Sequence, residues 1–312
     1  MTDSVPSAGS APASPVPDRR DLVGYGGRPP RVAWPGGAKV AVSFVINFEE
    51  GGEYSVGDGD HRNELVHEAI DDVGALPDPC TESHFGYGTR AAWWRIAALF
   101  DRYGMKPTVS SCGRAVERSP WVAADAVARG YEVSCHGWRW ERHTGMDEAH
   151  EREMIAKTHA AIEAACGVAP VGWHTRSASS VNTRRLLVEH GGFLYDSDAY
   201  DDDLPYFKTV AGKRHLVLPY AFDTNDMRFR PGGAFVHGED FARYVLAAYD
   251  WLAAEADEAP RMMSVGLHLR TIGRPGRIGG LAAILAGLVE RNTAWVARRD
   301  EIARHFIAEM DR

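Results

Sequence analysis

Three features are scarce in this sequence of 312 residues, and each scarcity excludes a class of protein. Its four cysteines, Cys80, Cys112, Cys135 and Cys166, form no CxxC pair, so they predict neither a zinc ribbon nor a disulfide framework. Positive charge is in deficit: the formal net charge is −8, which disfavours nucleic acid and anionic polymers as partners. No window approaches the roughly 18 apolar residues of a transmembrane helix, so no membrane partner is expected.

Several sequence signatures are also missing. There is no G-x-S-x-G elbow, which leaves a serine hydrolase without specific support. No G-x-G-x-x-G or P-loop pattern follows the first predicted strand, which argues against dinucleotide or nucleoside-triphosphate chemistry. The N-terminal residues lack a basic start followed by an apolar run, so residues 1–18 are predicted to be a disordered tail rather than a secretory signal. With the unpaired cysteines, this favours a reduced, cytoplasmic setting.

The composition that remains is typical of a globular protein with a substantial core, with 45% hydrophobic and 25% charged residues. One catalytic domain over residues 19–312 is the simplest organisation, because barrel folds of about 200–250 residues commonly form a single domain. The segment Gly51–Arg90 is irregular and polar, and it is long enough to form a functional loop or lid over a site.

Short apolar runs alternate with helix-like stretches along this domain. The first run, Lys39–Phe48, is nearly continuous, as expected of a strand covered on both faces in a parallel sheet. The predicted strands are 39–48, 108–112, 131–135, 171–174, 192–195, 262–269 and 293–297. The predicted helices are 147–166, 182–190 with Asn182 as N-cap, 239–258, 277–291 and 300–310. This alternation predicts an α/β protein whose parallel sheet is either closed into a barrel or open and doubly wound.

Ionisable side chains stand at the carboxyl ends of three predicted strands, where α/β folds place their active sites. Glu49 and Glu50 end the first strand, and His136 and His268 each belong to the end of a later one. Each has a structural alternative: a solvated pair of loop carboxylates, a hydrogen-bonded histidine beside packed tryptophans, and a structural histidine. The coincidence at three strand ends favours a shared site.

The chemistry of these groups suits acid–base hydrolysis. A carboxylate can take a proton from water, and a histidine can donate one to a departing nitrogen. No covalent intermediate is required. The predicted catalytic residues are therefore Glu49, Glu50, His136 and His268.

Longer motifs around these residues resemble the cofactor-independent allantoinases, a branch of the polysaccharide deacetylase (NodB-like) superfamily. In chain order they include FVINFEEGG (44–52), SCHGWRW (134–140), VEHGGFLYD (188–196), DTNDMRF (223–229) and GLH (266–268) followed by GRPGR (273–277). The resemblance runs from about Arg20 to the C-terminal helix. It implies a distorted (β/α)7 barrel of the polysaccharide deacetylase type and a homo-oligomer, frequently a tetramer.

The resemblance also implies a role for each strand-end group. Glu49 takes the position of the base, Glu50 and His136 take metal-ligand positions, and His268 takes the position of the acid. Glutamates replace both aspartates of the deacetylases, and Trp140 stands where those enzymes have a second metal-binding histidine. Because catalytic zinc normally has three protein ligands and a water, we expect catalysis without a cofactor. A divalent metal such as zinc, held by Glu50 and His136, is the alternative.

Without a metal, other groups must stabilise the oxyanion that forms when water attacks a carbonyl. Arg139, Arg90 or a protonated His136 could supply the donors. Trp138 and Trp140 could then wall a small, flat ring.

The substrate-binding residues are the least defined part of this prediction. The loop 173–182 is one residue longer than its counterpart in the allantoinases, and its arginine, Arg176, is shifted. The exact substrate therefore stays open. The predicted substrate-binding residues are Glu82, Arg90, Trp138, Arg139, Trp140, Arg176, Asn225 and Asp226.

The leading hypothesis is a hydrolase that cleaves a non-peptide carbon–nitrogen bond, by allantoinase-like ring opening of allantoin or a related cyclic imide or ureide. Its partner is then a small-molecule amide or imide. A metal-dependent polysaccharide or N-acetyl sugar deacetylase is the second hypothesis. A non-catalytic carbohydrate-binding homologue is the third, because altered ligand positions also mark inactive enzymes.

Overall fold

The structure is a computed structural model that describes residues 20–65 and 71–312. The tail predicted over residues 1–18 lies outside the described residues. In the segment that precedes Val32, the Asp21 side chain accepts hydrogen bonds from the amides of Val23 and Gly24 and closes a short turn. The described residues from Val32 to Arg312 form one compact unit.

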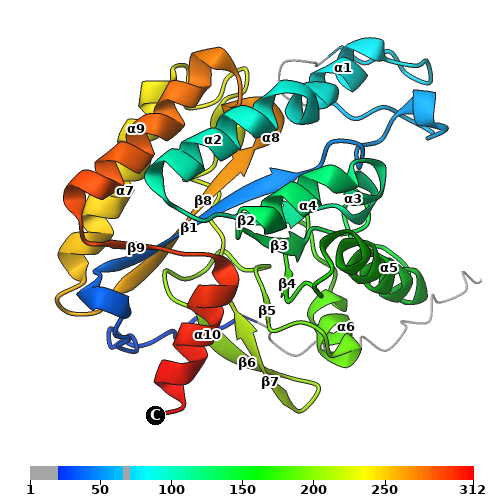
Figure 1. The fold of residues 1–312 in the computed structure, drawn as a ribbon. Helices are drawn as coiled ribbons and strands as arrows, with labels where there is room; N and C mark the ends of the chain where they lie inside the picture. The colour runs from blue at the N-terminus through cyan, green and yellow to red at the C-terminus, as the bar shows by residue number, and fades with distance from the viewer. Residues whose placement is uncertain (1–19, 66–70) are drawn as a thin grey trace, which may run out of the picture. The chain divides into compact units, whose positions relative to one another are not determined.

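Within the described residues, a curled sheet of nine strands forms the centre of this unit (Figure 1). Seven strands form the continuous parallel order β7-β5-β4-β3-β2-β1-β8; β9 also runs parallel beside the beginning of β1, and β6 pairs antiparallel with β7. The strands are β1 (Val40–Phe48), β2 (Thr108–Ser111), β3 (Glu132–Cys135), β4 (Gly172–Trp173), β5 (Tyr195–Asp196), β6 (Tyr206–Val210), β7 (Lys213–Val217), β8 (Arg261–His268) and β9 (Ala294–Val296). The predicted α/β fold with a distorted seven-stranded barrel is confirmed.

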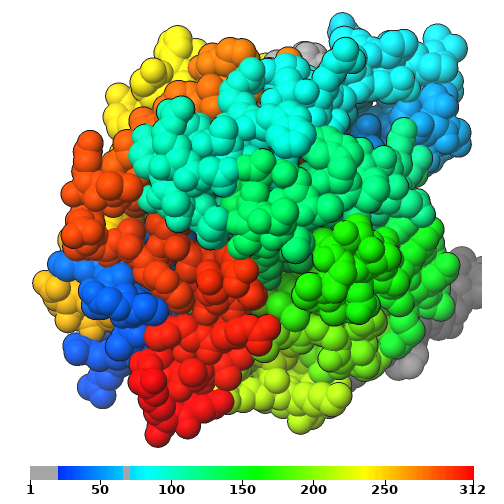
Figure 2. Space-filling view, viewed as in Figure 1, coloured from blue at the N-terminus to red at the C-terminus, as the bar shows by residue number. Residues whose placement is uncertain are grey.

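Helices follow most of the strands and pack on the outside of the sheet (Figure 1). In the same view, the side chains of α2, α4 and α5 cover the strands beneath them (Figure 2). The helices are α1 (Pro79–Tyr87), α2 (Trp93–Tyr103), α3 (Gly113–Arg118), α4 (Pro120–Ala128), α5 (Glu148–Cys166), α6 (Thr183–His190), α7 (Gly238–Glu255), α8 (Leu269–Ile272), α9 (Pro275–Arg291) and α10 (Arg299–Met310). None of the helices in the described ranges combines the length and apolar character needed to cross a membrane.

The hairpin β6–β7 was not predicted from the sequence, and it supplies the seventh parallel strand in place of residues 293–297. Its strands are short and half-exposed, so they lack the apolar run by which the other strands were recognised. The two-residue turn uses Ala211 and Gly212, both with positive φ, rather than the Asn-Gly pair that marks such turns in a sequence. The predicted strand 293–297 exists as β9, but it pairs with the beginning of β1 outside the parallel order.

The segment predicted to be irregular contains regular structure. Gly51–Arg90 holds a 3-10 turn, η2 (Val56–Asp58), the helix α1 and the beginning of a π-helical turn, η3 (Gly88–Ala92). The Asp78 side chain caps α1 by accepting from the amides of Cys80 and Thr81.

The cap of α6 also differs from the prediction. Asn182 precedes the helix, but its side chain accepts from Arg185 rather than from a backbone amide. Ser180 Oγ instead accepts the amides of Asn182 and Thr183. The predicted end of the helix at Gly191, which has a φ of 82°, is confirmed.

The register of the parallel strands determines where the predicted catalytic residues lie. All nine residues of β1 are buried, because one face packs against the outer helices and the other faces the interior of the curled sheet. Asn47 in β1 pairs with His268 in β8, and Ser111 in β2 pairs with Cys135 in β3. Glu49, His136 and His268 therefore emerge at the same edge of the sheet.

Candidate active site

A cavity of about 470 Å³ opens at the carboxyl ends of these strands. Buried polar and aromatic side chains that follow β1, β3, β4, β7 and β8 form its floor. They are Asn47, Glu49, His136, His174, Tyr220, Asn225 and His268. Three strand ends predicted from the sequence thus contribute to one cavity.

Glu49 is completely buried at the centre of this floor. Its Oε1 atom lies 3.3 Å from His136 Nε2 and 3.5 Å from His268 Nε2. Its Oε2 atom lies 2.7 Å from Arg270 Nη2. Burial by itself would raise the pKa of Glu49, but Arg270 and then His268 outweigh it and hold that pKa well below the ordinary value. Glu49 is therefore an ionised carboxylate with one oxygen held by arginine and the other facing two imidazoles.

His268 is oriented by a second carboxylate. Its Nδ1 atom donates to Asp226 Oδ1 at 2.6 Å, while Asp226 Oδ2 accepts the backbone amides of His268 and Ile272. Burial opposes protonation, but Glu49 and then Asp226 raise the pKa of His268 to about 9. At neutral pH the ring is an imidazolium whose Nε2 proton points to Glu49.

His136 is held in the same manner by a backbone group. Its Nδ1 atom donates to the carbonyl of His174 at 2.6 Å, so its Nε2 atom faces Glu49. The His174 ring stacks on it with the ring centroids 5.1 Å apart. Burial, and then His136, hold the pKa of His174 well below its ordinary value, so this ring is neutral. His174 was not among the predicted site residues, although its place after β4 resembles that of His136 after β3.

Arg270 was also missed as a site residue, although it is as deeply buried as Glu49. It is completely inaccessible to solvent, and it contacts both carboxylates at the end of β1: Nη2 lies 2.7 Å from Glu49 and Nη1 lies 3.5 Å from Glu50. Its guanidinium lies over the ring of Phe85 at 4.3 Å and near that of Trp140 at 5.0 Å. The available sequence signal was its position two residues after His268.

Glu50 faces away from this cavity. It lines a separate cavity of about 330 Å³, together with Glu53 and the predicted substrate-binding residue Glu82, which accepts a hydrogen bond from Ser55. Burial raises the pKa of Glu50 to about 7, with Arg270 opposing and Glu49 adding to this effect. Close to neutral pH, Glu50 is therefore protonated in a large fraction of molecules.

Three of the predicted substrate-binding residues line the catalytic cavity. They are Trp140, Arg176 and Asn225. The Arg176 guanidinium lies over the Trp140 ring at 3.5 Å, and Asn225 donates to the hydroxyl of Tyr220. Asp226 does not line the cavity; it accepts a hydrogen bond from His268 Nδ1, on the side of the ring away from Glu49.

The other predicted substrate-binding residues lie elsewhere for physical reasons. Arg139 pairs with both carboxylate oxygens of Asp60 at 2.5 Å and so anchors the loop after β1. Trp138 packs beneath the ammonium of Lys157, at 3.7 Å. Arg90 is exposed on the π-helical turn η3. None of these three is among the described residues that line the catalytic cavity.

The side chains at the predicted metal-ligand positions do not fit a divalent ion. Among residues 20–65 and 71–312, no group of three or more His, Cys, Asp or Glu side chains is arranged to hold a metal. Glu50 and His136 line different cavities, and the Trp140 ring offers no lone pair. The guanidinium of Arg270 already compensates the carboxylates that would attract a cation. No catalytic step is therefore assigned to a metal.

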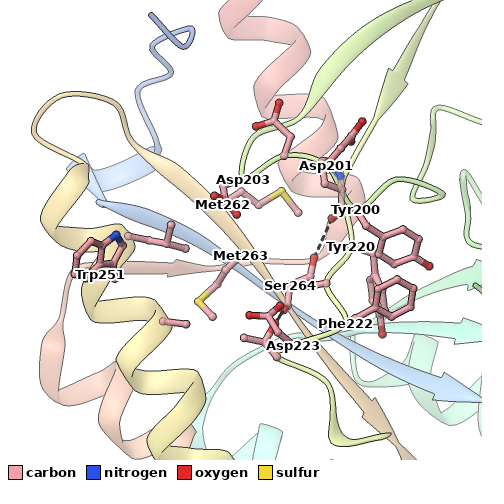
Figure 3. Close-up of a pocket in the computed structure, with 16 residues that line it drawn as sticks. Tyr200, Asp201, Asp203, Tyr220, Phe222, Asp223, Trp251, Met262, Met263 and Ser264 are labelled. Atoms are coloured by element: carbon pink, nitrogen blue, oxygen red, sulfur yellow. Dashed lines mark hydrogen bonds between the residues drawn. The ribbon is translucent and has the colours of Figure 1, made fainter. Parts of the chain in front are cut away.

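A larger cavity of about 580 Å³ adjoins this site (Figure 3). It is walled by stacked Tyr200 and Phe222, whose ring centroids are 3.9 Å apart, and on the opposite side by Trp251 of α7. Its ionisable groups are the aspartates Asp201, Asp202, Asp203 and Asp223, along with Tyr200 and Tyr220. No histidine, lysine or arginine is among its described lining residues, so the acid–base chemistry belongs to the smaller cavity.

Comparisons with known proteins identify the family of this chain. The family model for polysaccharide deacetylase matches residues 74–193. A Schizosaccharomyces pombe protein named as a polysaccharide deacetylase is 36% identical over 94% of this chain and 98% of its own.

Two solved structures are similar over nearly the whole chain. A probable polysaccharide deacetylase of Pseudomonas aeruginosa PAO1 has a TM-score of 0.89 at 44% identity, covering 93% of this chain and 98% of that one. The PuuE allantoinase has a TM-score of 0.89 at 43% identity, covering 94% and 98%. This chain therefore belongs to the polysaccharide deacetylase family, whose members with known structures include an allantoinase.

Proposed function

We propose that this protein is a metal-independent hydrolase that opens a small cyclic amide, imide or ureide, allantoin among them. The observation that carries the proposal is the convergence of three atoms on one point of the cavity: Glu49 Oε1, His136 Nε2 and His268 Nε2. Arg270 supports it by supplying buried positive charge directly to the carboxylate. The similarity to the PuuE allantoinase supports ring opening as the reaction.

The proposed reaction uses water as the nucleophile. Glu49 Oε1 accepts a proton from the water as its oxygen attacks the carbonyl carbon. We assign the stabilisation of the oxyanion that develops to His136, whose Nε2 atom faces the same point of the cavity. His268 Nε2 then delivers its proton to the ring nitrogen as the carbon–nitrogen bond breaks, and the proton held by Glu49 restores His268. The products are a carboxylic acid, which ionises, and the freed amide or amine.

The walls of the cavity favour a small ring over a polymer. The buried Trp140 ring lies beside the catalytic floor, and the Arg176 guanidinium is fixed over it at 3.5 Å and by the Trp140 carbonyl. A flat heterocycle can lie against the planar guanidinium of this stack. Allantoin, hydantoins and cyclic imides share this shape.

A substrate screen tests the proposal directly. The protein is stripped of metal and assayed against allantoin, hydantoin, succinimide and an N-acetylglucosamine oligomer. Hydrolysis of at least one ring is expected, with no release of acetate from the oligomer. Acetate release restored by added zinc would overturn the proposal in favour of a sugar deacetylase.

Removal of metal should leave turnover unchanged. The physical reason is that Arg270 already neutralises the carboxylates which a cation would need. Metal content before and after dialysis against a chelator is measured beside the rate of ring opening. One tightly bound zinc per chain, whose loss abolishes activity, would contradict this prediction.

Replacing Glu50 by Gln should reduce turnover less than tenfold. Glu50 faces the other cavity, and burial raises its pKa to about 7. The glutamine amide therefore resembles the neutral carboxylic acid that the wild-type protein already contains near neutral pH. Steady-state rates of Glu50→Gln at neutral pH check the prediction. A loss as large as that of the corresponding Glu49 variant would instead place Glu50 in the catalytic machinery.

Replacing Asp226 by Asn should move the alkaline limb of the pH–rate profile to lower pH. Wild-type activity is expected to fall as the pH rises through about 9, where His268 loses its proton. The Asp226 carboxylate contributes to raising that pKa, so an amide in its place lowers it. Values of kcat/KM across the alkaline range check this, with exposed Asp257→Asn as control. If the alkaline limb does not move, His268 is not the general acid of the reaction.

A further inference from the structure

The mouth of the catalytic cavity carries positive charge that the proposed reaction does not use. Three arginines from three loops line it: Arg62 after η2, Arg142 between β3 and α5, and Arg176 between β4 and α6. Arg62 and Arg142 are exposed and Arg176 is half-buried, whereas the catalytic side chains beneath them are fully buried. The cavity therefore has a charged outer part above its catalytic floor.

These arginines are only partly compensated. Among the residues that the structure describes, Glu64 is the one carboxylate that lines the outer part, and it lies 3.3 Å from Arg176. Arg62 lies over the ring of Tyr54 at 4.5 Å, and within residues 20–65 and 71–312 no carboxylate forms an ion pair with it. No carboxylate in the described ranges lies within 4.0 Å of Arg142. A local excess of positive charge at this mouth contrasts with the formal charge of −8 for the whole chain.

We propose that this mouth is a carboxylate-binding subsite, and that among cyclic amides, imides and ureides the preferred substrate bears a carboxylate outside the ring, in place of the uncharged ureido group of allantoin. The inference rests on the proposed ring-opening function. The ring lies on the floor with Glu49 and His268, and its carboxylate reaches Arg142 and Arg62. Guanidinium groups bind a carboxylate through two parallel hydrogen bonds, which a neutral substituent matches less well.

The size of the cavity agrees with a substituted ring. Its volume of about 470 Å³ is within the range of roughly 300–1,000 Å³ for pockets that enclose drug-sized ligands. A bare five-membered ring on the floor would leave the outer part to water. Arg176, fixed between Trp140 and Glu64, then forms the border between ring and carboxylate.

A matched pair of substrates tests the inference. Hydantoin-5-acetate and hydantoin-5-acetamide have the same ring and nearly the same shape, and differ in charge. We expect kcat/KM to be higher for the acetate, and Arg142→Gln to lower it about tenfold to 100-fold, the size of one lost charge-assisted hydrogen bond. The same variant should lower kcat/KM for the acetamide by a much smaller factor, because a neutral amide forms a weaker hydrogen bond with a guanidinium. Arg102→Gln, on the exposed surface of α2, is the control for charge alone.

The outcomes separate this inference from the proposed function. If both hydantoins are opened equally well and Arg142→Gln affects neither, the subsite is overturned while ring opening stands. If neither is opened, binding to Glu49→Gln is measured by calorimetry. Tighter binding of the acetate that Arg142→Gln abolishes supports the subsite even then, and equal binding of the two ligands overturns it.

Discussion

Replacement of Glu49 by Gln is expected to lower turnover about 10²- to 10⁴-fold, the contribution typical of a general base. The amide cannot take a proton from water, and it no longer presents a negative charge to His136 and His268. Because Arg270 and His268 hold the pKa of Glu49 well below its ordinary value, the wild-type base is ionised throughout the neutral range. Single-turnover rates of ring opening measure the loss without interference from product release.

Two further variants make this result specific. Glu49→Asp keeps the charge but shortens the reach, so it should retain more activity than Glu49→Gln. Glu117→Gln removes a carboxylate from the exposed surface of α3 and should have no effect. Turnover of Glu49→Gln within tenfold of wild type, in protein that melts normally, would assign the base to another residue.

Replacement of Arg270 by Met is expected to destabilise the fold by about 3–5 kcal/mol, the cost of leaving a buried charge without its partner. Glu49 would lose the cation at 2.7 Å, and Glu50 the one at 3.5 Å. The pKa of Glu49 should also rise, since Arg270 is the strongest of the groups that lower it. A depressed carboxyl pKa stabilises the fold above the unfolded-state value and loses that contribution as pH falls. The free energy of unfolding of the variant should therefore fall less than that of the wild type when the pH is lowered.

Urea unfolding at several pH values and the acid limb of the pH–rate profile measure these effects. In Arg270→Met the acid limb should move to higher pH. Adding Glu50→Gln should recover part of the stability, because one of the two uncompensated carboxylates is then removed. If Arg270→Met unfolds with the wild-type free energy, the guanidinium does not stabilise the carboxylates as inferred. Arg102→Met on the exposed surface of α2 is the matched control.

The elements that could be predicted from the sequence are those whose signal is local. A continuous apolar run predicts the buried strand β1. The glycines Gly167 and Gly191 predict where α5 and α6 end. The half-exposed strands β6 and β7 carry no such run. They form because they pair with each other and with β5, which a local pattern does not encode.

The predicted site divides in a similar way. Residues directly at strand ends, such as Glu49, His136 and His268, come together because parallel strands in register bring their carboxyl ends to one edge. Residues on the following loops do not share that constraint. Arg139 forms an ion pair with Asp60, and the Trp138 ring contacts the ammonium of Lys157. The contacts of a loop side chain depend on which groups the tertiary fold brings near it.

The α/β alternation and the strand ends that carry ionisable groups could be read from residue order alone, and the family resemblance marked Trp140 as a changed metal-ligand position. How charge is balanced around these groups depends on contacts between distant parts of the chain. Arg270 is separated from Glu49 by more than two hundred residues, yet β1 and β8 are neighbours, so its guanidinium lies 2.7 Å from that carboxylate. In a buried site electrostatic energy depends on such distances. The same holds for Glu49 and Glu50, which are adjacent in sequence but face different cavities and have opposite pKa shifts.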